Sequence, residues 1–214
     1  MEKRTKDIII AILAVGVAAV AIDFAWPGRS QRINLDPYNI LGAVTAEETA
    51  RLLGNKGQVL VMARGTGANN NPSVEAELRA FQQTLKKQKG IAVIVEKIQV
   101  SPMQMMATGG GVPPEQFLKA LEAHPGLGAV VLFLGFPQLT DSELEELKKS
   151  GVKTVVACAL RPGDQQLIER QAISLAIVPR SDAPPPEASA LRTLRERFDQ
   201  EFRIITSAAV APSP

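Results

Sequence analysis

The chain offers few side chains for covalent or metal chemistry. Its 214 residues include one His and one Cys, which excludes a zinc site built from several His and Cys ligands. Cys158 ends an apolar run, but Asp164 stands where the Cys-x5-Arg spacing of a phosphatase needs Arg. We therefore interpret Cys158 as a packing residue. His124 ends a predicted helix, where an imidazole near the helix dipole is the simple interpretation. The sequence predicts no metal, no cofactor and no catalytic group.

A Gly- and Asn-rich segment is the best candidate for binding a small ligand. Gly65-Thr66-Gly67-Ala68-Asn69-Asn70 begins like a dinucleotide fingerprint, but Asn70 replaces the third glycine, so the match is weak. No phosphate-binding P-loop motif occurs. A nucleotide- or phosphate-handling enzyme remains one alternative, and a sugar or anion receptor another. The candidate ligand-binding residues are Arg64, Thr66, Asn69, Asn70, Asn71 and Arg161.

Five apolar runs predict the strands that position these residues. They cover residues 58–63, 91–100, 129–134, 153–158 and 174–178. They alternate with helical patterns, which is typical of a parallel sheet covered on both faces. Right-handed crossovers make such a sheet doubly wound, and ligands bind at the carboxyl ends of its strands. The fold class expected is therefore α/β, with a mainly parallel five-stranded sheet.

Capping signals predict where the helices begin and end. Thr45 to Glu48 and Thr140 to Glu143 have the spacing of capping boxes, and Ser73 can cap a further helix. Met103, Met105 and Met106 fall in a long predicted loop, either as an adaptable contact surface or folded onto the domain. A last helix is expected over residues 187–202. Its apolar stripe, proposed to contact a partner, is Leu191, Leu194, Phe198 and Phe202. Residues 204–206 could add a strand.

The N-terminal segment has the composition of a membrane anchor. Residues 8–22 are uncharged and apolar, and a helix over residues 8–26 spans about 28 Å, enough for a bilayer core. The residues predicted to meet lipid are Ile8, Ile12, Val15, Ala19, Ile22 and Trp26. The basic residues before the helix favour a cytoplasmic N-terminus. A signal peptide cleaved after Ala19-Val20-Ala21 is the alternative.

The charge balance argues against a nucleic-acid partner. The chain has 24 basic and 22 acidic residues, a net charge of +2, without the one-sided basic surface that nucleic acids require. Basic residues of the last helix are matched by acidic ones on the same helix. The partners expected are therefore membrane lipid, through residues 8–26, and a membrane protein complex.

Two stretches resemble a known family. They are LLGNKGQVLV at residues 52–61 and FLKALEAHPGL at residues 117–127, which are similar to segments of type 1 periplasmic sugar-binding proteins. The resemblance covers about residues 46–180 and lies in hydrophobic pattern and loop lengths. It implies a flavodoxin-like lobe in an extracytoplasmic location.

The chain departs from that family where polar residues would hold a sugar. Glu77 and Ala80 replace the Arg and Gly of an Arg-x-x-Gly-Phe motif, although Phe81 is retained. Gly135-Phe136 stands in place of an Asn-Asp pair, and residues 157–159 in place of Gly-x-Asp. The chain is also too short for a second lobe.

These observations predict four regions. They are a membrane anchor (1–26), a tether with a short helix (27–56), the binding-protein-like lobe (57–180), and a Pro-rich hinge with a helix and tail (181–214). The expected protein is a single-pass inner-membrane (cytoplasmic-membrane) protein with a periplasmic domain. Its leading hypothetical function is that of a non-catalytic accessory or scaffold subunit that docks on a membrane complex.

Overall fold

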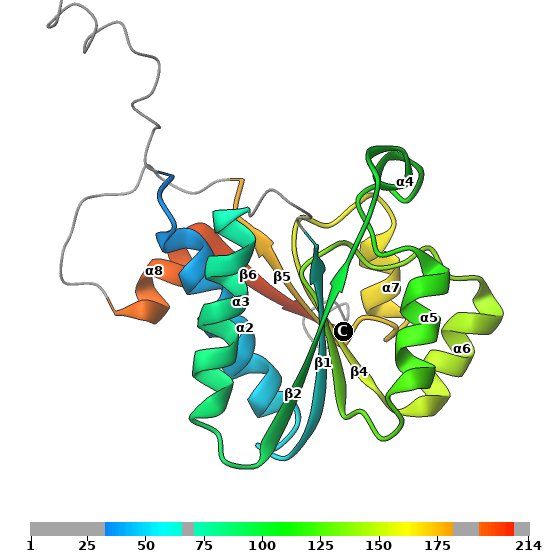
Figure 1. Cartoon of the computed structure of the whole chain (residues 1–214), viewed down its shortest axis with the longest axis horizontal. Coiled ribbons are helices and arrows are strands. Elements are labelled where there is room, and N and C mark those ends of the chain that lie inside the picture. Colours follow the sequence, from blue (N-terminus) through cyan, green and yellow to red (C-terminus); the bar gives the residue numbers. More distant parts are fainter. Residues whose placement is uncertain (1–32, 66–70, 182–192, 208–214) are drawn as a thin grey trace, which may run out of the picture. The chain divides into compact units, whose positions relative to one another are not determined.

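One sheet of six strands runs through the domain (Figure 1). The computed structural model describes residues 33–65, 71–181 and 193–207. The strands are β1 (Gly57–Arg64), β2 (Ile91–Ile98), β3 (Ala129–Leu132), β4 (Lys153–Ala157), β5 (Leu175–Pro179) and β6 (Phe202–Thr206). Their order is β2-β1-β3-β4-β5-β6. The five predicted parallel strands are confirmed. The sheet has six strands rather than five, because β6 adds an antiparallel edge to β5, which confirms the additional strand considered for residues 204–206.

Helices cover both faces of the sheet, so the doubly wound architecture is confirmed (Figure 1). On one face lie α2 (Asp36–Leu52), α3 (Pro72–Lys86) and α8 (Leu194–Glu201), with Phe81 and Phe198 fully buried against the strands. On the other face lie α5 (Pro114–Ala123), α6 (Asp141–Ser150) and α7 (Asp164–Glu169), whose Phe117 and Ile168 are equally buried. Residues 59–63 of β1 are all inaccessible to solvent, as expected for a strand sandwiched between two helical layers.

Helix α2 begins nine residues before the predicted capping box, so residues 36–44 are not a tether. The helix starts at Asp36, with Pro37 in its first turn. Thr45 lies inside the helix, and its buried hydroxyl donates to the carbonyl oxygen of Leu41 at 2.7 Å. Ile40 and Val44 pack into the core. Burial of these apolar side chains stabilises the helix across residues whose local sequence favours turns.

The other capping predictions gave mixed results. The box from Thr140 to Glu143 and the left-handed Gly151 that ends α6 are confirmed. The cap of α3 is Asn71 rather than Ser73, because its side chain accepts a bond from the Ser73 amide at 3.0 Å. The predicted loop around the methionines contains a short helix, α4 (Pro102–Ala107), with a capping box of its own formed by Ser101 and Gln104.

The last helix is shorter than predicted, which corrects the proposed partner surface. It covers only Leu194–Glu201, and Phe202 is the first residue of β6. Phe198 and Phe202 are buried in the core of this chain, with their rings stacked at 5.5 Å. Phe202 pairs with Pro179 of β5, so the helix and its apolar stripe end before this residue. Of the four proposed contact residues, Leu194 is exposed and Leu191 lies outside the described residues.

The predicted membrane anchor at residues 8–26 also lies outside the described residues. Within residues 33–65, 71–181 and 193–207, no helix has the length and apolar character needed to cross a bilayer.

Gly42 allows α2 and α3 to touch backbone to backbone. A Cβ atom built at Gly42 would lie 2.1 Å from the carbonyl oxygen of Glu77 and 3.2 Å from the Cβ of Ala80. The first distance is impossible for a real atom pair. Even one methyl group would therefore force the two helices apart.

We predict that Gly42→Ala destabilises the domain by about 2 kcal/mol, because overpacking outweighs the helix propensity gained. Urea denaturation measures the change. Ala43→Gly, on the next residue of α2, is the matched control and should cost about 1 kcal/mol through propensity alone. An increase in stability for Gly42→Ala would contradict the close contact.

Candidate functional site

Arg161 joins three loops at the carboxyl end of the sheet. It lies in the loop after β4, and its Nη1 donates to the carbonyl oxygen of Thr108 at 2.8 Å. Its Nη2 donates to the carbonyl oxygen of Phe136 and lies 3.2 Å from Oδ1 of Asp164. The loops that follow β2, β3 and β4 are thus held by one guanidinium group.

Asp164 holds Arg161 in place. Its side chain is 4% exposed, and its Oδ2 accepts bonds from the Arg161 backbone amide at 2.8 Å and from Nε at 3.4 Å. A buried carboxylate needs such partners, because desolvation of an unpaired charge is costly. The pair therefore fixes the loop after β4 as well as the position of the guanidinium.

Glycines let the other two loops approach the guanidinium. A Cβ atom at Gly111 would lie 2.5 Å from the carbonyl oxygen of Phe136 and 2.8 Å from Nη1 of Arg161. Gly111 forms a parallel bridge with Gly135, which replaces part of the family's Asn-Asp pair. Gly111 therefore has no room for a side chain, whereas a Cβ atom at Gly135 would lie 3.2 Å from the Cα of Gly111, which is tight.

A cavity of about 530 Å³ opens beside Arg161. It lies between the loops after β3 and β4, and its lining includes Gly109, Phe136, Gln138, Leu139, Arg161 and Gly163. Gln138 is exposed at its mouth. The position agrees with the rule that ligands of open α/β sheets bind outside the carboxyl ends of the strands.

The predicted ligand-binding residues that the structure describes have different roles. Arg161 lines the cavity. Arg64 ends β1, in register with Ile98 of β2, and Asn71 is engaged in capping α3. Thr66, Asn69 and Asn70 lie outside the described residues. Among the described members of the predicted set, Arg161 is therefore the one that the structure places at the cavity.

Two groups with raised pKa values, the half-buried Cys158 and the buried Glu77, lie near the same edge. Burial, reinforced by the negative charge of Asp164, raises the pKa of the Cys158 thiol to about 12. The thiol stays protonated at neutral pH and is a poor nucleophile, in agreement with a packing role. Burial also raises the pKa of Glu77 to about 8. Sequence reasoning noted Glu77 only as a departure from the family motif and missed that it is buried.

His124 has a specific partner that the sequence did not reveal. Its Nε2 lies 2.8 Å from Oε1 of Glu96 in β2, which ties the end of α5 to the edge strand. The helix-dipole interpretation is therefore incomplete, because the imidazole also contacts a carboxylate that lies 28 residues away along the chain.

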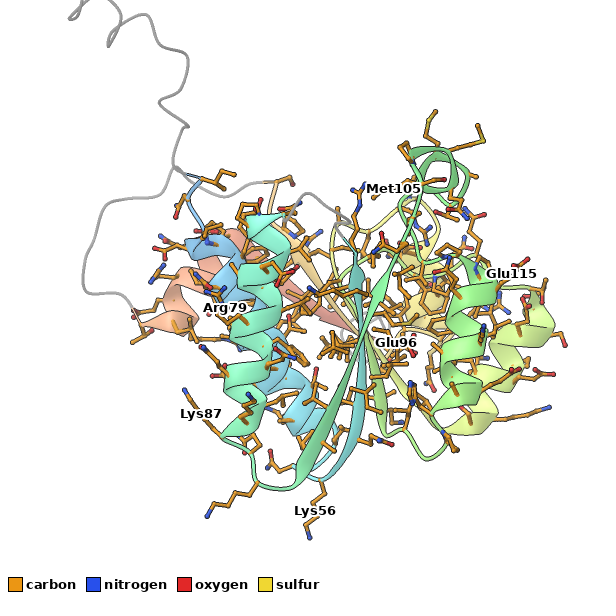
Figure 2. All side chains as sticks on the ribbon, viewed as in Figure 1. Lys56, Arg79, Lys87, Glu96, Met105 and Glu115 are labelled. Atoms are coloured by element: carbon orange, nitrogen blue, oxygen red, sulfur yellow. The ribbon has the colours of Figure 1, made fainter. Side chains whose placement is uncertain are left out.

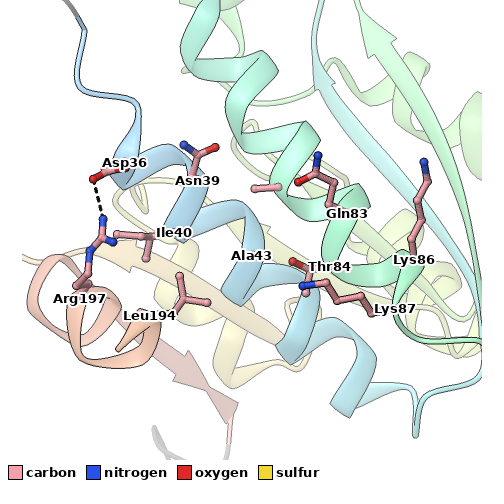
Figure 3. A pocket seen from close by; sticks show the side chains of 11 residues that line it. Asp36, Asn39, Ile40, Ala43, Gln83, Thr84, Lys86, Lys87, Leu194 and Arg197 are labelled. Carbon is pink, nitrogen blue, oxygen red and sulfur yellow. Dashed lines mark ion pairs between the residues drawn. The ribbon is translucent and has the colours of Figure 1, made fainter. Parts of the chain in front are cut away.

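A second cavity of about 560 Å³ lies between α2, α3 and α8 (Figure 3). Its apolar lining includes Ile40, Ala43, Ala80 and Leu194. An ion pair of 2.9 Å between Asp36 and Arg197 closes one end. Leu194, one of the exposed large hydrophobic residues in the described part of the chain, lies at this cavity.

Two of the three methionines of α4 are not folded onto the domain. Met103 is 81% exposed and Met106 is 85% exposed, while Met105 is half-buried. Figure 2 labels Met105 on this helix at the carboxyl end of the sheet. The interpretation that they fold onto the domain is therefore wrong for Met103 and Met106, and their use as a contact surface stays a prediction.

The fold is shared with solved sugar-binding proteins. AraP, an arabinose binding protein from Geobacillus stearothermophilus, superposes with a TM-score of 0.57 and 16% identity, covering 81% of this chain and 62% of its own. A protein titled "XylFII-LytSN complex" gives 0.55 and 14%, covering 80% and 60%. A periplasmic solute binding protein from Actinobacillus succinogenes 130z, with bound D-allose, gives 0.51 and 10%, covering 82% and 60%.

No family model matches the sequence, and no curated protein matches it. The chain spans about 60% of the length of the solved structures that it resembles. At these identities the likeness concerns the fold. The resemblance to type 1 periplasmic binding proteins is confirmed at that level.

We predict that Arg161→Ala destabilises the domain by about 3 kcal/mol, because it leaves a buried carboxylate and two carbonyl groups without their partner. Chemical denaturation measures this loss. Arg170→Ala removes an exposed ion pair with Asp141 and is the control, with a cost of about 0.5 kcal/mol. Equal costs for the two variants would show that the Arg161 bonds do not hold the loops.

We further predict that stability falls as the pH rises from about 4.5 to about 8. Unfolded Glu77 releases its proton near the ordinary value of 4.5, whereas folded Glu77 keeps it until about 8. The loss through this group is at most about 1.4 kcal/mol per pH unit. Urea denaturation at several pH values should show a flatter dependence for Glu77→Gln. Glu115→Gln, which removes an exposed carboxyl group on α5, should leave the dependence unchanged. A slope that Glu77→Gln does not alter would contradict the assignment.

Proposed function

We propose that the domain is a non-catalytic, extracytoplasmic binding lobe that takes a small polar ligand at the carboxyl edge of its sheet. The observation that carries this proposal is the cavity of about 530 Å³ beside Arg161. Its volume falls in the range of small-molecule sites, about 300 to 1,000 Å³. The solved structures of the same fold include proteins titled as binding arabinose or allose, which supports a ligand of the sugar class.

The charge of the cavity favours a neutral ligand over an anion. Asp164 compensates the charge of Arg161 at close range. Of the five N–H donors on a guanidinium, four are engaged with Thr108, Phe136 and Asp164. One donor on Nη1 is left for a ligand. Together with the exposed amide of Gln138, it suits hydroxyl groups better than a phosphate.

We propose that the domain lies on the outer side of the membrane that the N-terminal segment spans. The apolar residues 8–26 and the basic residues before them support a single-pass anchor with the domain outside the cytoplasm. One protein of the same fold is titled as periplasmic, which supports the same location.

We predict that arabinose or allose raises the melting temperature of the domain, because ligands that bind only the folded state stabilise it. Inorganic phosphate should have no effect. Gln138→Trp should abolish the shift by filling the mouth of the cavity, without touching the Arg161 bonds. Thermal denaturation and titration calorimetry measure both effects.

Gln83→Trp is the matched control. It places the same indole at the second cavity, between α2 and α3, and should leave the sugar response unchanged. The absence of a shift with any sugar tested, or a shift that survives Gln138→Trp, would refute binding at this cavity.

A second candidate function is that of an accessory subunit that docks on a membrane protein complex. The exposed Leu194 at the second cavity favours it (Figure 3). One protein of the same fold is titled as a complex with LytSN, which supports protein docking as a use of this architecture. In that case Gln83→Trp would release the partner in co-purification from mild detergent, while Gln138→Trp would not.

A further inference from the structure

Helix α4 presents apolar side chains to solvent although it is firmly held. Ser101 and Gln104 form both bonds of its capping box. At its other end the Thr108 hydroxyl donates to the carbonyl oxygens of Gln104 or Gly111, each at 2.9 Å, and Arg161 binds the Thr108 carbonyl. The exposure of Met103 and Met106 is therefore a property of the folded domain.

These methionines stand out from the rest of the described surface. Large hydrophobic residues that are exposed there are Ile33, Tyr38, Met103, Met106 and Leu194. The two methionines are more than 80% exposed, whereas Tyr38 and Leu194 are below 40%. Exposed apolar groups gathered at one place mark a contact with a protein or a membrane.

The methionines lie at the end of the domain where the chain enters it. Figure 1 shows α4 projecting beyond the carboxyl ends of the strands, and the first turn of α2 at that same end of the sheet. Tyr38, in this first turn of α2, is 37% exposed. Tyrosine suits a membrane surface, because one end of its ring is apolar and the other polar.

The length of the chain before α2 limits how far this end can be from a membrane. Nine residues, 27–35, separate Trp26 from the start of α2, and nine residues reach at most about 30 Å. Helix α2 then runs about 25 Å away from that point. If residues 8–26 cross the bilayer, as the proposed function requires, the carboxyl end of the sheet is the end that the tether brings to the membrane.

We propose that this end of the domain rests on the bilayer that anchors it, with Met103 and Met106 inserted among the lipid head groups. Unbranched methionine side chains adapt to such a disordered surface. No residue of α4 lines the cavity beside Arg161, so insertion of this helix does not occupy the proposed ligand site.

Depth measurements on the full chain in phosphatidylcholine vesicles test the proposal. The natural thiol is removed by Cys158→Ala, and an environment-sensitive fluorophore is attached through Met106→Cys. Lys56→Cys, at the opposite end of the sheet (Figure 2), carries the same fluorophore as control. We expect nitroxide on the lipid chains to quench the Met106 probe several-fold more than the Lys56 probe. Adding Met103→Glu should remove most of that difference, because a carboxylate resists insertion.

The outcomes are distinguishable. Equal quenching of the two probes by aqueous iodide, in vesicles that carry the chain on flotation, would overturn the proposal. A Met106 probe shielded from both iodide and lipid nitroxide would overturn it in favour of a protein contact. Failure of the chain to float with vesicles would instead refute the anchor, which belongs to the proposed function.

Discussion

The interaction between Arg161 and Asp164 is the constraint on which the carboxyl edge of the sheet depends. A buried carboxylate demands charge and hydrogen bonds from its surroundings, and Arg161 supplies both while it also binds the carbonyl groups of Thr108 and Phe136. Three loops that leave separate strands are thereby held against one planar group. Gly111 is needed because no side chain fits at its position between these loops.

The same interaction shapes what the cavity can bind. Four of the five guanidinium donors are engaged and the charge is balanced by Asp164. Arg161 therefore lines the cavity but has only one donor left for a ligand. The domain thus keeps the fold of sugar-binding proteins although Gly135, Phe136 and Ala159 stand where that family carries polar residues. Rigid loops and a preformed cavity reduce the ordering cost of binding, which is what the proposed ligand site needs when it has few polar groups. At the same edge α4 carries apolar residues outward, which separates the proposed ligand site from the surface proposed to meet lipid.

Much of the architecture could be predicted from local pattern, and the errors share one cause. The strands and the cap of α6 follow from apolar runs and from the Thr140 to Glu143 spacing, because these signals lie within a few residues. Helix α2 was predicted too short and the last helix too long. In both places burial against distant segments decided the outcome: Ile40 and Val44 gain a core, and Phe202 pairs with Pro179 of β5. At the site, Arg161 was predicted as a ligand residue, but two of its partners, the carbonyl groups of Phe136 and Thr108, lie 25 and 53 residues away, beyond the reach of a local sequence pattern.

The sequence by itself determined the class of fold, the scarcity of catalytic groups and the apolar N-terminal segment, since each depends on composition or short-range periodicity. The tertiary structure decided the roles of individual residues. In the folded domain Arg161 connects three loops, Glu77 is buried, and Met103 and Met106 are exposed rather than folded inward. These outcomes depend on which distant segments pack together and on how far that packing buries each side chain. Neither can be predicted from the residues nearby in the sequence.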